Sequence, residues 1–263
     1  MTSRTLPLSD GHHVHMLAQG RGEPLVLIHG VGMQAAAWGP QVAHFADRYR
    51  VIAVDMPGHG GSARLGGTPG LADYVRWMIE VIETLDVGPV NLAGHSMGAL
   101  IAGGVAIERP ALVRRLAVVN GVHRRSDAAR AAVVARAEQL RDGHLDIDTP
   151  LQRWFDVPDA PPALVETVRG WLEQVDLQGY ADAYRAFARG DLLYADRWCE
   201  VQCPTLALTG ADDLNSTGAM AQRMAGLAAR GHAVILEGQR HMVNLTAPDL
   251  VNRAMSDWLA APP

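Results

Sequence analysis

Short apolar runs alternate along the chain with longer segments whose apolar residues recur at helical spacing, and this order occurs twice. The compact run LVLIH at residues 25–29 is stopped by Gly30 and Gly32, as buried strands often are, and VIAVD at residues 51–55 is expected to be the next strand. Residues 71–85 instead place their apolar side chains on one helical face. Strands that alternate with helices in this way predict a mainly parallel sheet covered on both faces by helices.

The pattern assigns an expected structure to most of the chain. Strands are expected at residues 14–17, 25–29, 51–55, 89–94, 116–120, 205–209 and 233–237, and helices at residues 34–47, 71–85, 96–108, 216–229 and 248–259. Between residues 122 and 198 the sequence has helical stretches but no convincing strand. A helical stretch between two strands of one sheet is typical of a lid. We therefore expect a single domain with core segments 1–121 and 199–263 and a lid insertion at 122–198.

The composition is that of a globular protein. The 263 residues suffice for one large domain with a buried core, and 48% of them are hydrophobic while 19% are charged. The net charge is -5, and charged residues of both signs are scattered along the chain without a basic block. This distribution argues against a nucleic-acid partner. No uncharged apolar run of about 18 residues occurs, so a membrane span is not expected.

Targeting and redox features indicate the cytoplasm. Residues 1–11 contain no apolar run of the kind that signal peptides carry. The two cysteines, Cys199 and Cys203, are too few for a disulfide framework and lack the partners of a zinc site. His13 and His15 would share one strand face, but no third ligand is near them in the sequence. We predict a cytoplasmic protein without a metal or cofactor, and the sequence leaves its oligomeric state open.

The strongest chemical motif is G-x-S-x-G at residues 94–98. An apolar strand leads into it and a helix rich in small residues leads out, which is the strand–turn–helix context of a nucleophile elbow. Ser96 would stand on a strained turn at the carboxyl edge of the sheet, near a helix N-terminus that favours negative charge. The alternative is that Ser96 only caps the helix, but the context favours a nucleophile. His95 is expected to face away from the substrate and to be structural.

A serine nucleophile needs a base, and the base needs a carboxylate to orient it. His241 lies in the loop after the strand expected at 233–237, at the sheet edge where the elbow emerges, and is the predicted base. The strand expected at 205–209 ends in Gly-Ala-Asp-Asp. Asp213 reaches further from the strand end and is the predicted acid, while Asp212 is expected to cap or brace the loop.

Acyl transfer also requires hydrogen-bond donors for the oxyanion of the tetrahedral intermediate. The residue after the nucleophile supplies one of them, the backbone N–H of Met97. The second is expected from the loop after the strand at 25–29, where glycines on both sides of Val31 allow its N–H to turn inward. The alternative is a purely structural glycine turn.

From the HG-V-G loop through GHSMG to GADD and the final histidine, the chain resembles the α/β-hydrolase superfamily. The resemblance implies an eight-stranded, mainly parallel α/β sheet with a helical lid, and the chain order serine, acid, histidine. In some members the acid follows the strand before the lid; that position here holds Asn120, which favours Asp213. The turn at residues 55–62 (DMPGHGGS) also matches the family, and its His59 is expected to be structural.

Specificity is expected to depend on the lid. Arg124 follows the last strand before the lid, and Arg153 stands beside Trp154 and Phe155. Because arginine binds carboxylates in a bidentate manner, we hypothesise that Arg124 or Arg153 holds an acidic substrate. The alternative, at least as well supported, is that both are solvated helix residues. Trp154 either packs the lid onto the core or faces the pocket.

These features predict a serine hydrolase that acts on a small molecule through an acyl-enzyme. Its size and compact lid are similar to the branch with 3-oxoadipate enol-lactonase-like and small-acid hydrolases, so an ester or lactone is the first expectation. An amide, N-acyl or C–C bond in aromatic or heterocyclic compound degradation is the alternative, because the same triad serves all of them. A non-catalytic receptor and a cofactor-free oxygenase of the same fold stay open. Ser96 argues against dehalogenases and epoxide hydrolases, which carry a carboxylate nucleophile.

Overall fold

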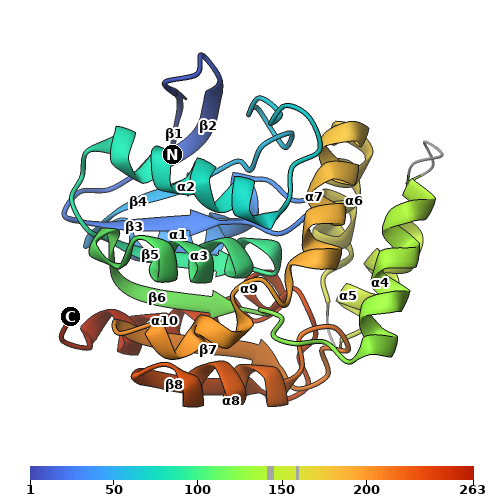
Figure 1. Cartoon of the computed structure of the whole chain (residues 1–263). Helices are drawn as coiled ribbons and strands as arrows, with labels where there is room; N and C mark the ends of the chain where they lie inside the picture. The colour runs from blue at the N-terminus through green and yellow to red at the C-terminus, as the bar shows by residue number, and fades with distance from the viewer. Residues whose placement is uncertain (141–144, 158–159) are drawn as a thin grey trace.

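A sheet of eight strands forms the centre of the molecule (Figure 1). The computed structural model describes residues 1–140, 145–157 and 160–263. The strands are β1 (Thr2–Pro7), β2 (His13–Gln19), β3 (Glu23–Ile28), β4 (Tyr49–Val54), β5 (Val90–His95), β6 (Val113–Val119), β7 (Pro204–Gly210) and β8 (Arg230–Leu236). Their order across the sheet is β1-β2-β4-β3-β5-β6-β7-β8. The two pairings of β2, with β1 and with β4, are antiparallel, and all the others are parallel.

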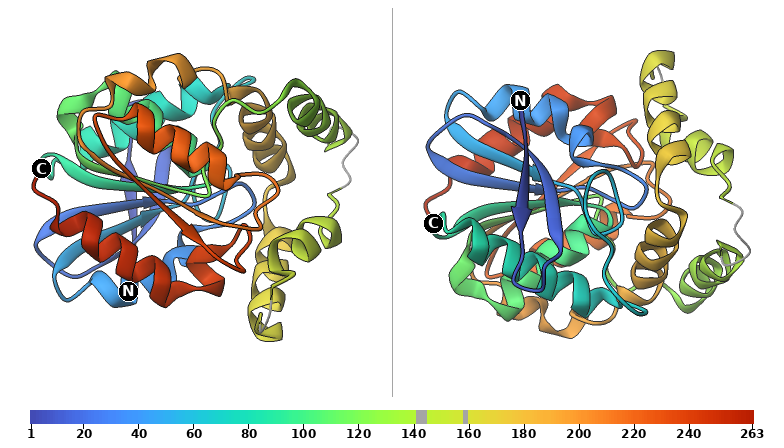
Figure 2. Two further views of the ribbon diagram at one scale, coloured as in Figure 1. Left: turned by 90° about the horizontal axis from the view of Figure 1, so that it is seen from below. Right: turned by 90° about the horizontal axis from the view of Figure 1, so that it is seen from above.

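Helices cover both faces of this sheet, as Figure 2 shows in two views. Alternation along β3 sends Val26 and Ile28 into the core on one face and Leu25 and Leu27 into the core on the other. The first face is covered by α2 (Leu71–Leu85), α3 (Met97–Glu108) and α8 (Gly218–Leu227). The second is covered by the 3-10 helix η1 (Ala35–Trp38), α1 (Gly39–Phe45), α9 (Val243–Thr246) and α10 (Pro248–Ala260). The predicted α/β fold with a mainly parallel eight-stranded sheet is therefore confirmed.

Two local predictions differ from the structure. The first strand, β1, was not expected, because as an edge strand its residues are mostly exposed and it carries no apolar run. The helix expected at 34–47 is divided into η1 and α1, since Gly39 and Pro40 start a new helix and proline fits only its first turn. Neither difference moves the strand ends at which the proposed catalytic residues lie.

The chain between β6 and β7 forms a helical insertion beyond the carboxyl ends of the central strands (Figures 1 and 2). Its helices are α4 (Asp127–Gln139), α5 (Asp148–Phe155), α6 (Pro162–Gln174) and α7 (Leu177–Gly190), followed by the 3-10 helix η4 (Ala195–Glu200). A further 3-10 helix, η2 (Pro110–Leu112), lies outside the insertion, between α3 and β6. Within the described ranges, no helix is long and apolar enough to cross a membrane.

A buried ionic contact joins the two ends of the insertion. Asp191, just after α7, is fully buried and accepts a hydrogen bond from the backbone N–H of Arg125 at 2.8 Å. Its carboxylate also pairs with the guanidinium of Arg125 at 3.4 Å and with that of Arg130 at 3.1 Å. Because both ends of the insertion meet at this carboxylate, the start of α4 and the end of α7 are held together above the sheet.

Candidate active site

Ser96 occupies a sharp turn between β5 and α3. Its backbone has φ 55° and ψ -113°, a region that side-chain-bearing residues rarely adopt and that active-site residues tolerate at a cost. The turn needs glycine on both sides: a Cβ on Gly94 would lie 2.0 Å from the carbonyl oxygen of Gly98, and one on Gly98 would lie 2.3 Å from that of Ile28. The G-x-S-x-G motif therefore presents the Ser96 hydroxyl at the carboxyl edge of the sheet.

His241 and Asp213 meet Ser96 in a continuous hydrogen-bonded chain. The Ser96 hydroxyl lies 3.0 Å from Nε2 of His241, and Nδ1 of His241 lies 2.7 Å from Oδ2 of Asp213. Asp213 can only accept here, so Nδ1 carries the proton and Nε2 is free to accept the Ser96 proton. All three side chains are nearly buried. The geometry allows His241 to act as a general base on Ser96.

Asp213 is held as a carboxylate by donors from three directions. Its Oδ1 accepts the backbone N–H groups of Asn215 at 2.8 Å and Ser216 at 3.1 Å, and its Oδ2 accepts Nδ2 of Asn120 at 2.8 Å. Burial by itself would raise the pKa of Asp213, but His241 and these hydrogen bonds outweigh it and hold the pKa below its usual range. The neighbouring Asp212 is exposed, and the carboxylate hydrogen-bonded to His241 is that of Asp213.

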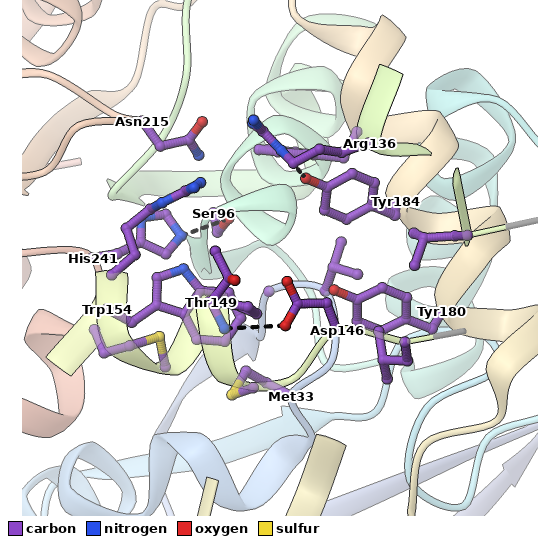
Figure 3. A pocket seen from close by; sticks show the side chains of 18 of the residues that line it. Met33, Ser96, Arg136, Asp146, Thr149, Trp154, Tyr180, Tyr184, Asn215 and His241 are labelled. Atoms are coloured by element: carbon purple, nitrogen blue, oxygen red, sulfur yellow. Dashed lines mark hydrogen bonds between the residues drawn. The ribbon is translucent and has the colours of Figure 1, made fainter. Parts of the chain in front are cut away.

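Two further rings pack against His241. Nε2 of His95 donates to the backbone carbonyl of His241 at 2.8 Å, and the two ring centroids are 5.0 Å apart. Burial lowers the pKa of His95 to about 3, so this ring is neutral and holds the His241 backbone in place. The indole of Trp154, from α5, stacks on the His241 ring with centroids 6.0 Å apart and planes inclined by 27° (Figure 3).

The loop that follows β3 lies directly against the nucleophile. A Cβ on Gly30 would approach the Cβ of Ser96 to 3.0 Å, so the backbone at Gly30 passes close to the serine. Val31 lines the same pocket as Ser96, and Met97 begins α3 immediately after it. Gly32 has φ +79°, and a side chain there would collide with Leu172 and Tyr180 of the helical insertion. The two predicted oxyanion donors thus lie on the backbone segments that adjoin Ser96.

A pocket of about 340 Å³ opens above the serine, between the sheet and the helical insertion. Figure 3 shows Arg136 and Tyr184 on one side of it and His241 and Trp154 on the other. The core contributes Val31, Met33, Asn215 and Met242 besides the proposed catalytic residues, and the insertion contributes Arg136, Asp146, Thr149, Arg153, Trp154, Tyr180, Tyr184 and Phe187. The walls are therefore mainly apolar and aromatic, and their charged side chains are both cationic, from Arg136 and Arg153, and acidic, from Asp146 and Asp213.

The structure separates the two arginines that were predicted to meet substrate. Arg153 lines the pocket, as does Trp154. Arg124 does not: it is exposed, its backbone turns at φ 49°, and its guanidinium pairs with the exposed Asp196. The expectation that Arg124 could hold a substrate is corrected, because this surface ion pair directs its side chain away from the pocket lining.

Arg136 was missed in the sequence, although α4 carries a signal for it. Nε of Arg136 lies 3.3 Å from the hydroxyl oxygen of Tyr184 at the pocket wall. In α4, Val133, Arg136 and Ala137 fall on one helical face, and Leu140 continues it. A charged residue on an otherwise apolar helical face is an indication that the face borders a cavity as well as a core.

Comparisons with known proteins show the family and the fold of the chain. A model of the "Alpha/beta hydrolase family" matches residues 25–254. The chain is 57% identical, over all of both sequences, to an (E)-2-((N-methylformamido)methylene)succinate hydrolase of Acinetobacter baylyi. It is 28% identical to 3-oxoadipate enol-lactonase 2 of the same organism, over 88% of this chain and 86% of the lactonase. Among solved structures, a thermophilic esterase from Thermogutta terrifontis has a TM-score of 0.88 at 22% identity and covers 98% of each chain.

Proposed function

The chain belongs to the α/β-hydrolase family and is a hydrolase, and from this premise we propose that it cleaves an N-acyl amide bond in a small dicarboxylate. The observation that carries the proposal is the 57% identity, over the full length of both chains, to a hydrolase whose substrate is named as an N-methylformamido-methylene succinate. This substrate class corresponds to the alternative drawn from the sequence. The expectation of an ester or lactone is supported only at the level of a hydrolase.

In the proposed first step the Ser96 oxygen attacks the carbonyl carbon of the amide. His241 takes the Ser96 proton through Nε2, and Asp213 stabilises the imidazolium that forms. The negative charge that develops on the carbonyl oxygen is held by the N–H groups of Val31 and Met97. The C–N bond then breaks and His241 returns its proton to the leaving group, which departs as an N-methyl enamine when the substrate is the relative's formamide.

In the second step the acyl group, a formyl group for that substrate, is esterified to Ser96. Water enters the place of the leaving group and gives a proton to Nε2 of His241 as it attacks the ester carbon. The same two N–H groups hold the second oxyanion, and the ester bond breaks as His241 protonates the Ser96 oxygen. Formate leaves and the hydroxyl of Ser96 is restored. Both steps transfer the proton through Nε2 of His241, because the hydrogen bond between Nδ1 and Asp213 keeps the other ring proton on Nδ1.

The two carboxylates of such a substrate have candidate partners in the helical insertion. Arg136 and Arg153 both line the pocket, and neither forms an ion pair with any carboxylate in residues 1–140, 145–157 and 160–263. Their guanidinium groups are therefore available to bind substrate carboxylates, as bidentate hydrogen bonding favours. The Tyr184 hydroxyl beside Arg136 adds a further donor. Trp154 supplies a flat apolar wall for a conjugated enamide.

We assign the helical insertion, residues 122–198, the role of a lid. Its helices supply one wall of the pocket while the core supplies the nucleophile, so the covered site keeps water away from the developing charge. A wall built from an insertion can change its side chains without disturbing the strand ends that carry Ser96, Asp213 and His241. Lactone hydrolysis is the second candidate, supported by the 28% identity to an enol-lactonase.

The test is a comparison of substrates on the purified protein. Initial rates are measured with (E)-2-((N-methylformamido)methylene)succinate, with 3-oxoadipate enol-lactone and with p-nitrophenyl acetate, and formate is quantified for the first. We expect kcat/KM for the formamide to exceed that for the other two by about 100-fold or more, because only it would use both the acyl site and the two arginines. A higher kcat/KM for the lactone would replace the amide proposal with the second candidate.

Ser96→Ala is the control for the nucleophile. Removing the serine of a triad lowers kcat by roughly 10⁴-fold or more, so formate release should fall by that factor. The variant retains the pocket, and substrate binding measured by calorimetry should persist. Formate release at the wild-type rate in Ser96→Ala would exclude a serine-based mechanism.

A further inference from the structure

Two buried histidines that the proposed mechanism does not use lie on either side of the Val31 peptide. His29 follows β3 and His59 lies in the turn after β4, and each residue is only 1% exposed. Their ring centroids are 5.4 Å apart. Both rings contact the backbone of the loop that carries Val31, so they bear directly on one of the proposed oxyanion donors.

The partners of His59 determine its tautomer. The Gly32 N–H donates to Nε2 of His59 at 3.0 Å, and Nδ1 of His59 donates to the carbonyl of Pro57 at 3.1 Å. Nε2 must therefore be unprotonated, since it accepts a hydrogen bond, and the ring is neutral. Burial, followed by the neighbouring His29, lowers the pKa of His59 to about 3, which keeps the acceptor available at neutral pH.

His29 holds the other side of the same loop. Its Nδ1 donates to the carbonyl of Gly30 at 2.7 Å, and its Nε2 accepts the backbone N–H of Met56 at 2.9 Å. The Gly30 carbonyl belongs to the same peptide group as the Val31 N–H and points in the opposite direction from it. A donor on that carbonyl both orients the peptide and polarises its N–H.

We propose that His59 is a positioning residue that, together with His29, aims the Val31 N–H at the oxyanion. This inference rests on the proposed function. Val31 lies between two peptide groups, one fixed through the Gly30 carbonyl and the other through the Gly32 N–H, so its own N–H has a single direction. A donor that is oriented before the reaction does not have to reorganise as charge develops. The histidine of the DMPGHGGS turn thus acts on catalysis through the backbone of another loop.

The test compares His59→Leu with His59→Gln. Leucine removes the acceptor for the Gly32 N–H, whereas glutamine can place an amide oxygen where Nε2 stands. Removing one oxyanion donor lowers kcat by about 10²- to 10³-fold, so misaiming one in His59→Leu should lower it by about 10- to 100-fold. The KM should change by no more than about threefold, since the loop acts on the transition state. We expect His59→Gln to recover most of the lost kcat.

His123→Leu is the matched control. His123 is also buried, and its Nε2 is 3.2 Å from one backbone carbonyl, that of Ala195, away from the loop. It should lose stability without a comparable loss of kcat. Inhibition by 1,1,1-trifluoroacetone, which forms a tetrahedral oxyanion adduct with a serine hydroxyl, should weaken in His59→Leu by the same factor as kcat/KM. An equal loss of kcat in both leucine variants, or a loss confined to KM, would overturn the proposal.

Two measurements distinguish a failure of the His59 proposal from a failure of the proposed function or of folding. Ser96→Ala is assayed alongside: wild-type activity in that variant would overturn the proposed function and this inference with it, whereas its inactivity leaves the His59 comparison to decide. In the wild type, nitrogen-15 spectra of the histidine rings should show His59 with a proton on Nδ1 and none on Nε2 at pH 7. A proton on Nε2 would contradict the hydrogen bond from Gly32, even if no leucine variant folds.

Discussion

The two sides of the pocket are built in different ways. On the core side, polar side chains are held by backbone groups of strand ends: Asp213 receives two backbone N–H donors, and His95 donates to the His241 carbonyl. On the helical insertion, apart from the buried pairs of Asp191, several ion pairs join exposed side chains, such as Arg189 with Glu138. Exposed pairs of this kind contribute little to stability, whereas hydrogen bonds from fixed backbone groups are both buried and oriented.

This difference indicates a division of work within one site. The core fixes the atoms that make and break bonds, because small displacements there would be costly to the rate. The insertion lines the pocket with side chains whose contacts to substrate depend on helix packing over the sheet. Substitutions on the two sides should therefore change different kinetic constants.

The largest effect expected in this comparison is that of Asp213→Asn. Asparagine cannot stabilise the imidazolium of His241 and can bind the wrong tautomer, so kcat should fall by about 10³- to 10⁴-fold. The KM should change little, because Asp213 lies behind His241. The measurement is steady-state kinetics on (E)-2-((N-methylformamido)methylene)succinate. Asp212→Asn is the control: Asp212 is exposed and next in sequence, and its replacement should leave kcat within about threefold of wild type. A similar loss in both variants would assign no special role to Asp213.

A smaller effect, on the other constant, is expected from the insertion. Arg153→Met and Arg136→Met each remove one guanidinium from the pocket wall, and each should raise the KM for the dicarboxylate by about 10- to 100-fold, the worth of a hydrogen bond to a charged group. Arg124→Met is the control, because Arg124 pairs with Asp196 outside the pocket. A dimethyl ester of the substrate should abolish the difference between these variants. Should Arg153→Met lower kcat as strongly as Asp213→Asn does, the division between the two sides would not hold.

The same division explains what the sequence could predict. The elbow, the loop after β3 and the turn after β7 are local patterns: a strand end, a glycine that permits close approach and one reactive residue occur within a few positions. The structure brings Ser96, His241 and Asp213 together as expected because parallel strands end at one edge. The contribution of Asn120 was not foreseen, since its hydrogen bond to Asp213 depends on a tertiary contact and not on a motif.

The pocket-lining residues of the insertion could not be predicted from local sequence patterns in this way. Arg124, Arg136 and Arg153 are the same residue type in or beside helical segments, and local sequence does not say which of them the packing of α4 and α5 turns inward. Only Arg136 carries a partial signal, because it lies on the apolar face of α4. Where a side chain's role depends on how one helix rests on another, sequence patterns give candidates and the structure selects among them.

The smallest predicted effect concerns stability and again belongs to the core. His59 and His95 are buried and neutral, with pKa values lowered to about 3, while an unfolded chain binds these protons near pH 6.5. Between those limits the unfolded state binds more protons than the folded state, so the free energy of unfolding should fall as pH falls, by about 1.4 kcal/mol per pH unit for each histidine. Urea unfolding of the wild type and His95→Gln at pH 7, 6 and 5 measures this slope, which should be shallower in the variant.

Gln41→Leu is the control. Gln41 is equally buried and bonded to the Asn244 carbonyl but carries no titrating proton, so its replacement should shift the free energy of unfolding by the same amount at every pH. If the His95→Gln slope equals that of the wild type, His95 takes up its proton without unfolding, and the core edge is less rigid than its hydrogen bonds imply.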